Sequence, residues 1–319
     1  MVNTLSIVIP VYLNSESISE LIVGLSKVAQ MASVNFNFNL EVVFVVDGSP
    51  DDSYAQLVQE LPNAPFSSQL ILHSRNFGSF AAIRTGLQVA CGQYFCFISA
   101  DLQEPPDLAL LFLKKLITNE FEVVVGCRER RHDPYLSRLA SGFFWIMYKK
   151  FIINDMPEKG VDVFGCNKIF RDQLLKLDES NSSLIGLIFW LGYRRGEVLY
   201  ERHLRRWGRS TWTLKKKMKY LFDSIFSFTD LPIKLITLIG LFSLITSISL
   251  SLVVITAKVY SLIEVPGYAT TVLLIIFFGG LNSLGLGIVG TYAWRAFENT
   301  KSRPLAVVMA KTQFNKTVV

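Results

Sequence analysis

The chain has 319 residues, of which 50% are hydrophobic, and a formal net charge of +6. This length allows one large domain and an appendage. A nucleic-acid binder can show the same charge balance, but here the basic clusters flank apolar stretches, which favours a membrane surface and no nucleic acid. The four cysteines fit neither a zinc site nor a redox CxxC pair, so we expect reduced thiols, mostly buried, in a cytosolic domain.

Short apolar runs alternate with helical patterns from the N-terminus to about residue 126. Residues 1–4 lack a basic n-region, so we expect no signal peptide and a first domain that stays in the cytosol. The predicted strands are 5–9, 41–46, 70–72, 94–98 and 122–126, and the predicted helices are 18–31, 53–61, 78–90 and 107–117. This alternation predicts an α/β domain with a mostly parallel sheet over residues 1–212.

Polar segments follow each predicted strand, where the ligands of parallel sheets bind. They are residues 12–16, 47–51, 75–78, 101–104 and Arg128. There is no GxGxxG and no Walker lysine, so acids beside a phosphate ligand would need a bridging Mg²⁺ or Mn²⁺. Asp101 and Gln103 are the candidate metal ligands, and the alternative is a solvated turn acid.

Residues 213–231 have an amphipathic pattern, with apolar positions three or four residues apart opposite Lys215, Lys216 and Lys217. We expect a helix lying in the membrane interface, and the alternative is a helix packed on the domain. Residues 235–257 and 269–294 carry no charge and are long enough to cross a bilayer, so residues 232–319 are predicted to hold two transmembrane helices and a cytosolic C-terminal tail.

Basic flanks predict how these spans are oriented. Basic residues precede the first span and follow the second, which places both flanks and both termini in the cytoplasm of a multi-pass cell-membrane protein. Ser283 and Gly287 have the spacing of close helix contacts, which leaves open a homo-oligomer as well as packing within the hairpin.

Several short motifs carry a resemblance that covers nearly the whole chain. They are IPVY (9–12), DGSPD (47–51), SRNFG (74–78), ADLQEPP (100–106), GCR (126–128), GVD (160–162), GRSTW (208–212) and GIVG (287–290). In order and spacing the chain resembles family-2 glycosyltransferases with a GT-A (Rossmann-like) fold. The narrower resemblance is to polyprenyl-phosphate glycosyltransferases, such as bactoprenol glucosyltransferases and dolichol-phosphate mannose synthases.

The resemblance implies roles for particular residues. For the donor nucleotide it implies Pro10, Tyr12, Glu16, Asp47, Arg75 and Asp101. For a Mg²⁺ or Mn²⁺ ion it implies Asp101 and Gln103, and for catalysis Asp162, Arg128 and Arg205. For the acceptor phosphate and the membrane it implies Arg206, Arg209, Ser210, Lys215, Lys216 and Lys217. Three roles of Asp162 are left open: a base, a group that orients the sugar or acceptor, and a structural turn acid.

The implied activity is inverting transfer of a hexose, foremost glucose from UDP-glucose, to polyprenyl (undecaprenyl) phosphate on the cytosolic face of the membrane. One alternative is a catalytically silent membrane scaffold or nucleotide-sugar sensor. Another is a processive polysaccharide synthase, although His203 stands where such enzymes carry glutamine before Arg206-Trp207. Two departures from the family pattern concern the site: Ser99 replaces the first acid of Asp-x-Asp, and Val46 the first of a double acid.

Overall fold

The computed structural model describes residues 3–129, 157, 161–179, 182–204, 206–207, 214–229, 231–260 and 267–316. The chain divides into two compact units. The first comprises Met1–Lys217 and Arg303–Val319, and the second Met218–Ser302.

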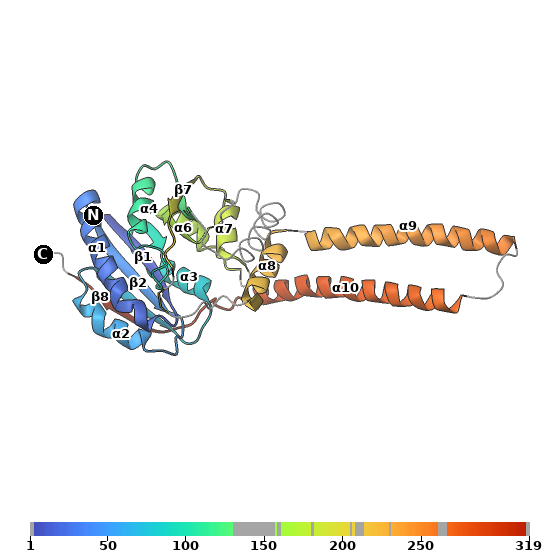
Figure 1. The fold of residues 1–319 in the computed structure, drawn as a ribbon, viewed down its shortest axis with the longest axis horizontal. Helices are drawn as coiled ribbons and strands as arrows, with labels where there is room; N and C mark the ends of the chain where they lie inside the picture. Colours follow the sequence, from blue (N-terminus) through green and yellow to red (C-terminus); the bar gives the residue numbers. More distant parts are fainter. Residues whose placement is uncertain are drawn as a thin grey trace. The chain divides into compact units, whose positions relative to one another are not determined.

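The first unit is built on a single mixed sheet with helices on its faces (Figure 1). Its strands are β1 (Asn3–Val11), β2 (Phe38–Val46), β3 (Ser67–His73), β4 (Tyr94–Phe97), β5 (Val123–Arg128), β6 (Val163–Asn167), β7 (Arg195–Tyr200) and β8 (Val308–Phe314). Their order is β7-β5-β6-β4-β1-β2-β3-β8. The helical segments are η1 (Ser15–Ser17), α1 (Ile18–Phe36), α2 (Ser53–Glu60), η2 (Leu61–Asn63), α3 (Ser79–Val89), α4 (Leu108–Leu116), α6 (Lys168–Leu174) and α7 (Leu184–Trp190).

The core lies along β1 and β2, whose near-continuous apolar runs are buried on both faces. Close approach of α3 to β1 requires a small residue at position 86, because a Cβ added to Gly86 would lie 2.2 Å from Cγ1 of Val8. This packing fixes α3 beside the sheet and so fixes the start of that helix near the end of β3.

The five strands and four helices predicted up to residue 126 are confirmed. The prediction of a mostly parallel sheet agrees with the parallel pairs β1–β2, β1–β4, β2–β3 and β5–β7, but β6 runs antiparallel to β4 and β5, and β8 runs antiparallel to β3. Alternating strand–helix patterns predict parallel neighbours, but they do not reveal strands that return from elsewhere in the chain. The result is a mixed sheet of eight strands among the described residues.

The strand β8 was not expected from the sequence, which indicated only a tail. It pairs with β3 in a register that sets Thr312 opposite Leu70, and Ser74 N donates to Val307 O at 2.9 Å. Most of its side chains are exposed, so its backbone pairing rather than apolar burial holds it at the edge. The chain therefore leaves the first unit after Lys217 and returns to it at Arg303.

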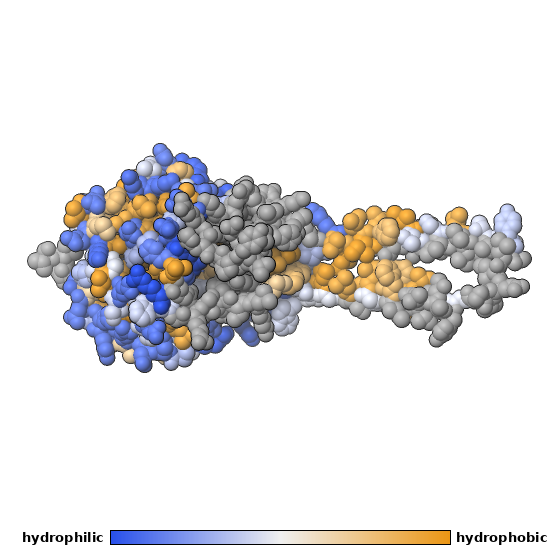
Figure 2. Space-filling model, in the orientation of Figure 1, coloured by the Kyte–Doolittle hydropathy of each residue, from blue (hydrophilic) through white to orange (hydrophobic). Residues whose placement is uncertain are grey.

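The second unit consists of helices: most of α8 (Leu214–Phe228), α9 (Leu231–Val259) and α10 (Tyr268–Thr300). The segments expected to be helical here are confirmed as helices. Figure 2 shows hydrophobic residues gathered on α9 and α10, and many large apolar side chains there are exposed, including Leu238, Phe242, Ile275 and Leu286.

No single helix within the described residues meets the length and hydropathy expected of a bilayer span. The segments Leu221–Phe228 and Pro232–Phe242, taken together, meet both criteria by length and composition alone. The two segments are bent by 74° relative to one another.

Contacts within the second unit tie α8 to α10. Arg295 forms an ion pair with Asp223 at 2.6 Å, and its guanidinium lies 5.2 Å from the centre of the Phe226 ring. The Phe226 and Tyr292 rings pack edge-on at 5.3 Å. The polar and aromatic contacts of α8 described here are therefore made with α10.

Candidate functional site

The sheet topology brings the predicted strand-end segments to one edge. Strands β1, β2, β3 and β4 are parallel, and β5 points the same way because β6 runs antiparallel to both of its neighbours. For the same reason the residue before β6, Asp162, lies at the edge where β4 and β5 end. Strand β7 is parallel to β5, so residues 201–204 follow at this edge too.

Hydrogen bonds join the loops after β1, β2 and β4. Ser49 Oγ accepts from Leu13 N at 2.8 Å, Asp51 Oδ2 accepts from Ser15 N at 3.0 Å, and Ser17 Oγ donates to Ala100 O at 2.8 Å. Burial opposes ionisation of Asp51, but hydrogen bonds from the Ser49 hydroxyl, the Ser15 amide and Ser53 lower its pKa below the usual value. The edge is therefore a set of linked loops rather than separate turns.

The Asp47 side chain supports the loop after β3. It is 2% exposed; its Oδ1 lies 2.9 Å from His73 Nδ1 and accepts from Phe77 N at 2.9 Å, while Oδ2 accepts from Gly78 N at 2.7 Å. Arg75, predicted to contact the donor, is exposed on this loop, with its guanidinium 4.1 Å from the centre of the Phe77 ring. In this arrangement the Asp47 carboxylate positions the loop that carries Arg75.

Gly48 makes a close approach to the same loop. Its φ is +57°, and an added Cβ would lie 2.3 Å from the carbonyl carbon of Arg75. We expect Gly48→Ala to destabilise the sheet unit by at least about 1–3 kcal/mol from the strained backbone alone, and the clash adds to this cost. Gly192→Ala is the matched control, because Gly192 has φ +71° but a Cβ added there would lie 4.0 Å from its nearest neighbour, Trp190 O. Equal losses of melting temperature in the two variants would contradict the close approach.

Asp162 is held by Arg128 and Tyr200. Arg128 donates to both carboxylate oxygens, at 2.5 and 2.7 Å, and the Tyr200 hydroxyl donates to Oδ2 at 3.0 Å. Burial, with the nearby Asp162 charge, raises the pKa of Tyr200, so the phenol remains a donor at neutral pH. The bidentate geometry fixes the orientation of the Asp162 carboxylate.

Asp101 and Gln103 lie on one turn after β4, separated by Leu102 at φ 56°. Gln103 N donates to Asp101 Oδ1 at 3.2 Å, and both side chains are partly buried. Gln103 also binds the segment after β7: its Oε1 accepts from an Arg202 Nη2 at 2.6 Å, and its carbonyl accepts from His203 N at 2.9 Å. The turn after β4 and the segment after β7 therefore meet at Gln103.

The next residue, Glu104, is 1% exposed. Burial raises its pKa, and Arg202, the Ser99 hydroxyl and other nearby charges modify the shift. The Arg202 Nε lies 3.4 Å from Glu104 Oε1, and no described residue makes a hydrogen bond to Glu104 Oε2. Ser99 stands where the family pattern has an acid, and its hydroxyl is hydrogen-bonded to another acid, Glu104.

This donor set fits a hard divalent cation. The side chains of Asp101 and Gln103 both offer oxygen donors, the type that Mg²⁺ and Mn²⁺ prefer. No cluster of three or more His, Cys, Asp and Glu side chains in the described residues is arranged to hold a metal. A Mg²⁺ ion commonly uses one or two carboxylates and completes its shell with water and substrate phosphate, so the smaller set is sufficient.

The other predicted residues are more dispersed. Pro10 lies within β1, Tyr12 is partly buried, Glu16 is exposed in η1, and Arg206 is exposed with its Nη1 3.2 Å from Glu20 Oε1. Arg205, Arg209 and Ser210 lie outside the described residues. Lys215, Lys216 and Lys217 lie in the first turn of α8, but their side chains are not among those that the structure describes.

Tyr200 and Arg202 were not singled out in the sequence, and Glu104 was included only as the last residue of the segment 101–104. Glu104 lies inside the ADLQEPP motif, which is the one signal that could have singled it out. Tyr200 ends β7 and Arg202 follows it, and the sequence shows no partner for this strand, so only the pairing of β7 with β5 brings them to Asp162 and Gln103.

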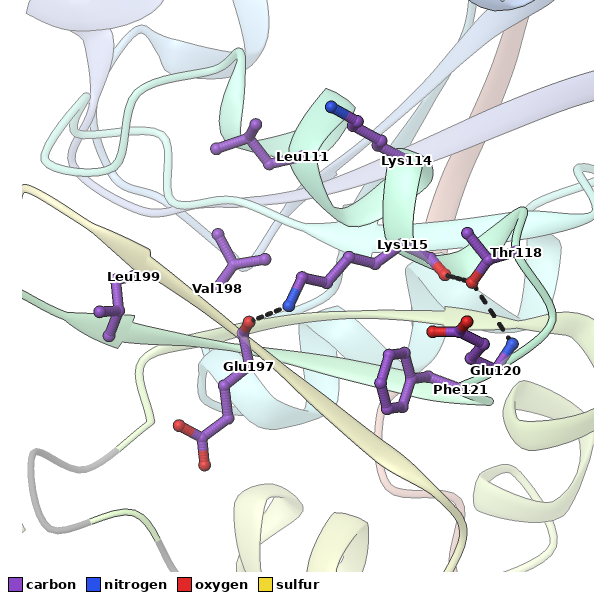
Figure 3. Close-up of a pocket in the computed structure, with 9 residues that line it drawn as sticks. All are labelled: Leu111, Lys114, Lys115, Thr118, Glu120, Phe121, Glu197, Val198 and Leu199. Atoms are coloured by element: carbon purple, nitrogen blue, oxygen red, sulfur yellow. Dashed lines mark hydrogen bonds between the residues drawn. The ribbon is translucent and has the colours of Figure 1, made fainter.

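A separate hollow of about 610 Å³ lies between α4 and β7 (Figure 3). Leu111, Lys115, Phe121 and Leu199 are among its lining residues, and Lys115 Nζ donates to Glu197 O at 2.7 Å across it. It shares no residue with the cluster at the strand ends, and we assign the candidate site to that cluster.

Comparisons with known proteins show which family the chain belongs to. The chain is 30% identical, over 95% of its length and 92% of the relative's, to an uncharacterized glycosyltransferase, YkcC, of Bacillus subtilis. It is 27% identical, over 95% of its length and 92% of the relative's, to an undecaprenyl-phosphate 4-deoxy-4-formamido-L-arabinose transferase of Yersinia enterocolitica.

Among solved structures, glucosyl-3-phosphoglycerate synthase of Mycobacterium tuberculosis, in complex with Mn²⁺, UDP and phosphoglyceric acid, matches with a TM-score of 0.46 and 15% identity. The match covers 65% of this chain and 72% of that one. Residues 6–177, more than half of the chain, match the family described as Glycosyl transferase family 2. The chain therefore belongs to glycosyl transferase family 2.

Proposed function

We propose that this glycosyltransferase moves a hexose, foremost glucose from UDP-glucose, to polyprenyl (undecaprenyl) phosphate on the cytosolic face of the cell membrane. The observation that carries the proposal is the cluster at the strand ends, where Asp101 and Gln103 lie on a turn bound to the segment after β7. The relative named as an undecaprenyl-phosphate transferase supports the class of acceptor.

The acceptor chemistry explains why the cluster needs no strong base. A phosphate monoester has a second pKa near 6 and is mostly dianionic at pH 7, so its oxygen is already a nucleophile. Both Asp162 oxygens accept hydrogen bonds, from Arg128 and Tyr200. We assign Asp162 the role of orienting the donor sugar or the acceptor, and direct displacement at the anomeric carbon inverts its configuration.

Holding two anions together is the harder task. A Mg²⁺ or Mn²⁺ ion, when bound, would supply Lewis-acid stabilisation of the leaving diphosphate. Asp101 and Gln103 would hold it, while Arg75, exposed on its loop, contacts the donor nucleotide beside Tyr12 and Glu16. Arg205, Arg206, Arg209 and Ser210 are assigned to the acceptor phosphate, as the family resemblance implies.

The membrane part of the proposal is a two-helix hairpin with both termini in the cytoplasm. It is supported by the uncharged runs 235–257 and 269–294, which lie inside α9 and α10, and by the exposed apolar side chains of these helices. Because the chain leaves one unit after Lys217 and re-enters the same unit at Arg303, we assign both ends of the hairpin to the same side of the membrane. The small residues Ser283 and Gly287 of α10 allow a homo-oligomeric contact as well as packing within the hairpin.

A donor screen tests the proposal. Membranes containing the chain are incubated with undecaprenyl phosphate and one labelled nucleotide sugar at a time, UDP-glucose first. We expect label to enter the lipid fraction with at least one donor. Lipid that stays unlabelled with every nucleotide sugar would contradict the proposal and favour the scaffold or sensor.

The basic start of α8 provides a separate prediction. We expect replacement of Lys215, Lys216 and Lys217 by Glu to reduce lipid glycosylation more than donor binding, since each Lys near an anionic surface contributes about 1 kcal/mol of membrane attraction. The control replaces three exposed lysines of the sheet unit, Lys27, Lys168 and Lys316, by Glu, with the same change of net charge. Sugar transfer to lipid and nucleotide affinity are measured for both triple variants. If the variant at Lys215, Lys216 and Lys217 loses transfer and nucleotide affinity equally, the role of these lysines at the membrane surface is contradicted.

A further inference from the structure

Arg202 bridges Gln103, a proposed metal ligand, and the neighbouring residue Glu104. Its Nη2 donates to Gln103 Oε1 at 2.6 Å, and its Nε lies 3.4 Å from Glu104 Oε1. The Arg202 side chain is 25% exposed, whereas the Glu104 side chain is 1% exposed. The guanidinium is therefore anchored over a buried carboxylate and reaches out to a more accessible amide.

The contact with Gln103 uses the oxygen on which the proposed function depends. Of the Gln103 side-chain atoms, only Oε1 can bind a cation, and Mg²⁺ binds such oxygens at about 2.0–2.1 Å. A guanidinium nitrogen 2.6 Å from the same oxygen would place two cations within a few ångströms of each other. Their repulsion in a partly buried site is strong, so the metal and the present position of Arg202 exclude one another.

The contact with Glu104 is the one that Arg202 keeps. A buried carboxylate that loses the cation paired with it is strongly destabilised. Moving from Gln103 Oε1 toward Glu104 requires only a small change, because Nε is already 3.4 Å from Glu104 and makes no hydrogen bond with any described residue. Glu104 is thus an anchor, and Gln103 is the contact that can be exchanged.

We propose that Arg202 is a positioning residue that occupies Gln103 Oε1 before the divalent cation arrives and yields that oxygen to it while staying paired with Glu104. This inference rests on the proposed metal site at Asp101 and Gln103. It assigns the segment after β7 a direct part in metal affinity, because Arg202 lies two residues beyond that strand.

The test measures Mn²⁺ binding without donor or acceptor, using the full-length protein and the electron paramagnetic resonance signal of free Mn²⁺. We expect Arg202→Met to bind Mn²⁺ roughly tenfold more tightly than the parent protein, because a competing cation is removed. In a Gln103→Ala background, where the contested oxygen is absent, the same substitution should change the affinity little. Arg194→Met is the control, because Arg194 pairs with Glu122, away from the cluster.

A second variant guards against misfolding. Arg202→Met with Glu104→Gln removes both charges of the pair, so no unpaired buried carboxylate remains, and it should show the same gain in affinity. Unchanged or weaker Mn²⁺ binding in both variants, or no Mn²⁺ binding by any of the proteins, overturns the inference. A gain that persists in full in the Gln103→Ala background also overturns it, because the effect would then be long-range charge repulsion.

Asp101→Ala separates this inference from the proposed function. If Asp101→Ala abolishes Mn²⁺ binding and Arg202→Met has no effect, the metal site stands and only the role of Arg202 fails. If Asp101→Ala leaves Mn²⁺ binding intact, the metal lies elsewhere, and both the proposed metal site and the inference fail.

Discussion

Replacement of Asp101 by alanine is expected to lower kcat/KM for sugar transfer by at least about a hundredfold, because a metal at a leaving group contributes several kcal/mol. Asp101 is the one carboxylate on the turn after β4 that is partly accessible and adjacent to Gln103. Transfer of labelled sugar to undecaprenyl phosphate over a range of Mn²⁺ and Mg²⁺ concentrations measures the effect.

Asp107→Ala is the matched control for this prediction. Asp107 is an exposed acid at the start of α4, in the same loop, and its side chain makes no capping hydrogen bond. We expect its activity to stay close to that of the parent protein. Transfer retained by Asp101→Ala at unchanged metal dependence would rule out Asp101 as a metal ligand.

The second large effect is expected at Asp162. Asp162→Ala leaves Arg128 without its bidentate partner, and hydrogen bonds to charged groups are worth about 1.5–3 kcal/mol, so we expect kcat/KM to fall by roughly ten- to a hundredfold or more. Asp162→Asn keeps one acceptor oxygen and should lose less. Asp178→Asn is the control, because Asp178 is an exposed partner of Arg84 away from the cluster.

The pH dependence of transfer distinguishes the two roles of Asp162. If Asp162 orients a substrate, the Asn variant keeps the acid limb of the parent profile, which follows ionisation of the acceptor phosphate near pH 6. If Asp162 removes a proton, the Asn variant loses that limb together with nearly all activity. The profile of kcat/KM between about pH 5 and pH 8 separates these outcomes.

The α/β alternation up to residue 126 could be predicted because it depends on local periodicity. The apolar runs of β1 and β2 are long and buried on both faces, and strand ends of parallel sheets meet at one edge whatever the rest of the chain does. This is why the sequence alone predicts Asp101, Gln103 and Arg128 at one edge of the sheet, and why it places Asp47 at the correct edge.

What Asp47 does at that edge could not be predicted. Its carboxylate is 2% exposed and accepts from the backbone of the next loop, which depends on how close β2 and β3 bring those loops. Strand β6 was also out of reach, because a five-residue strand carries little pattern of its own and is stabilised by neighbours on both sides. Its direction is what places Asp162 beside Arg128.

Local sequence patterns thus determined the main strands, the helices and the acids that follow them, since each depends on residues only a few positions apart. The contacts of Arg202 with Gln103 and Glu104, about one hundred positions away, and the return of β8 to the sheet depend on strand order. Strand order is set by packing and backbone pairing over the whole domain, and a pattern read along one segment carries no information about which distant segment will complete it.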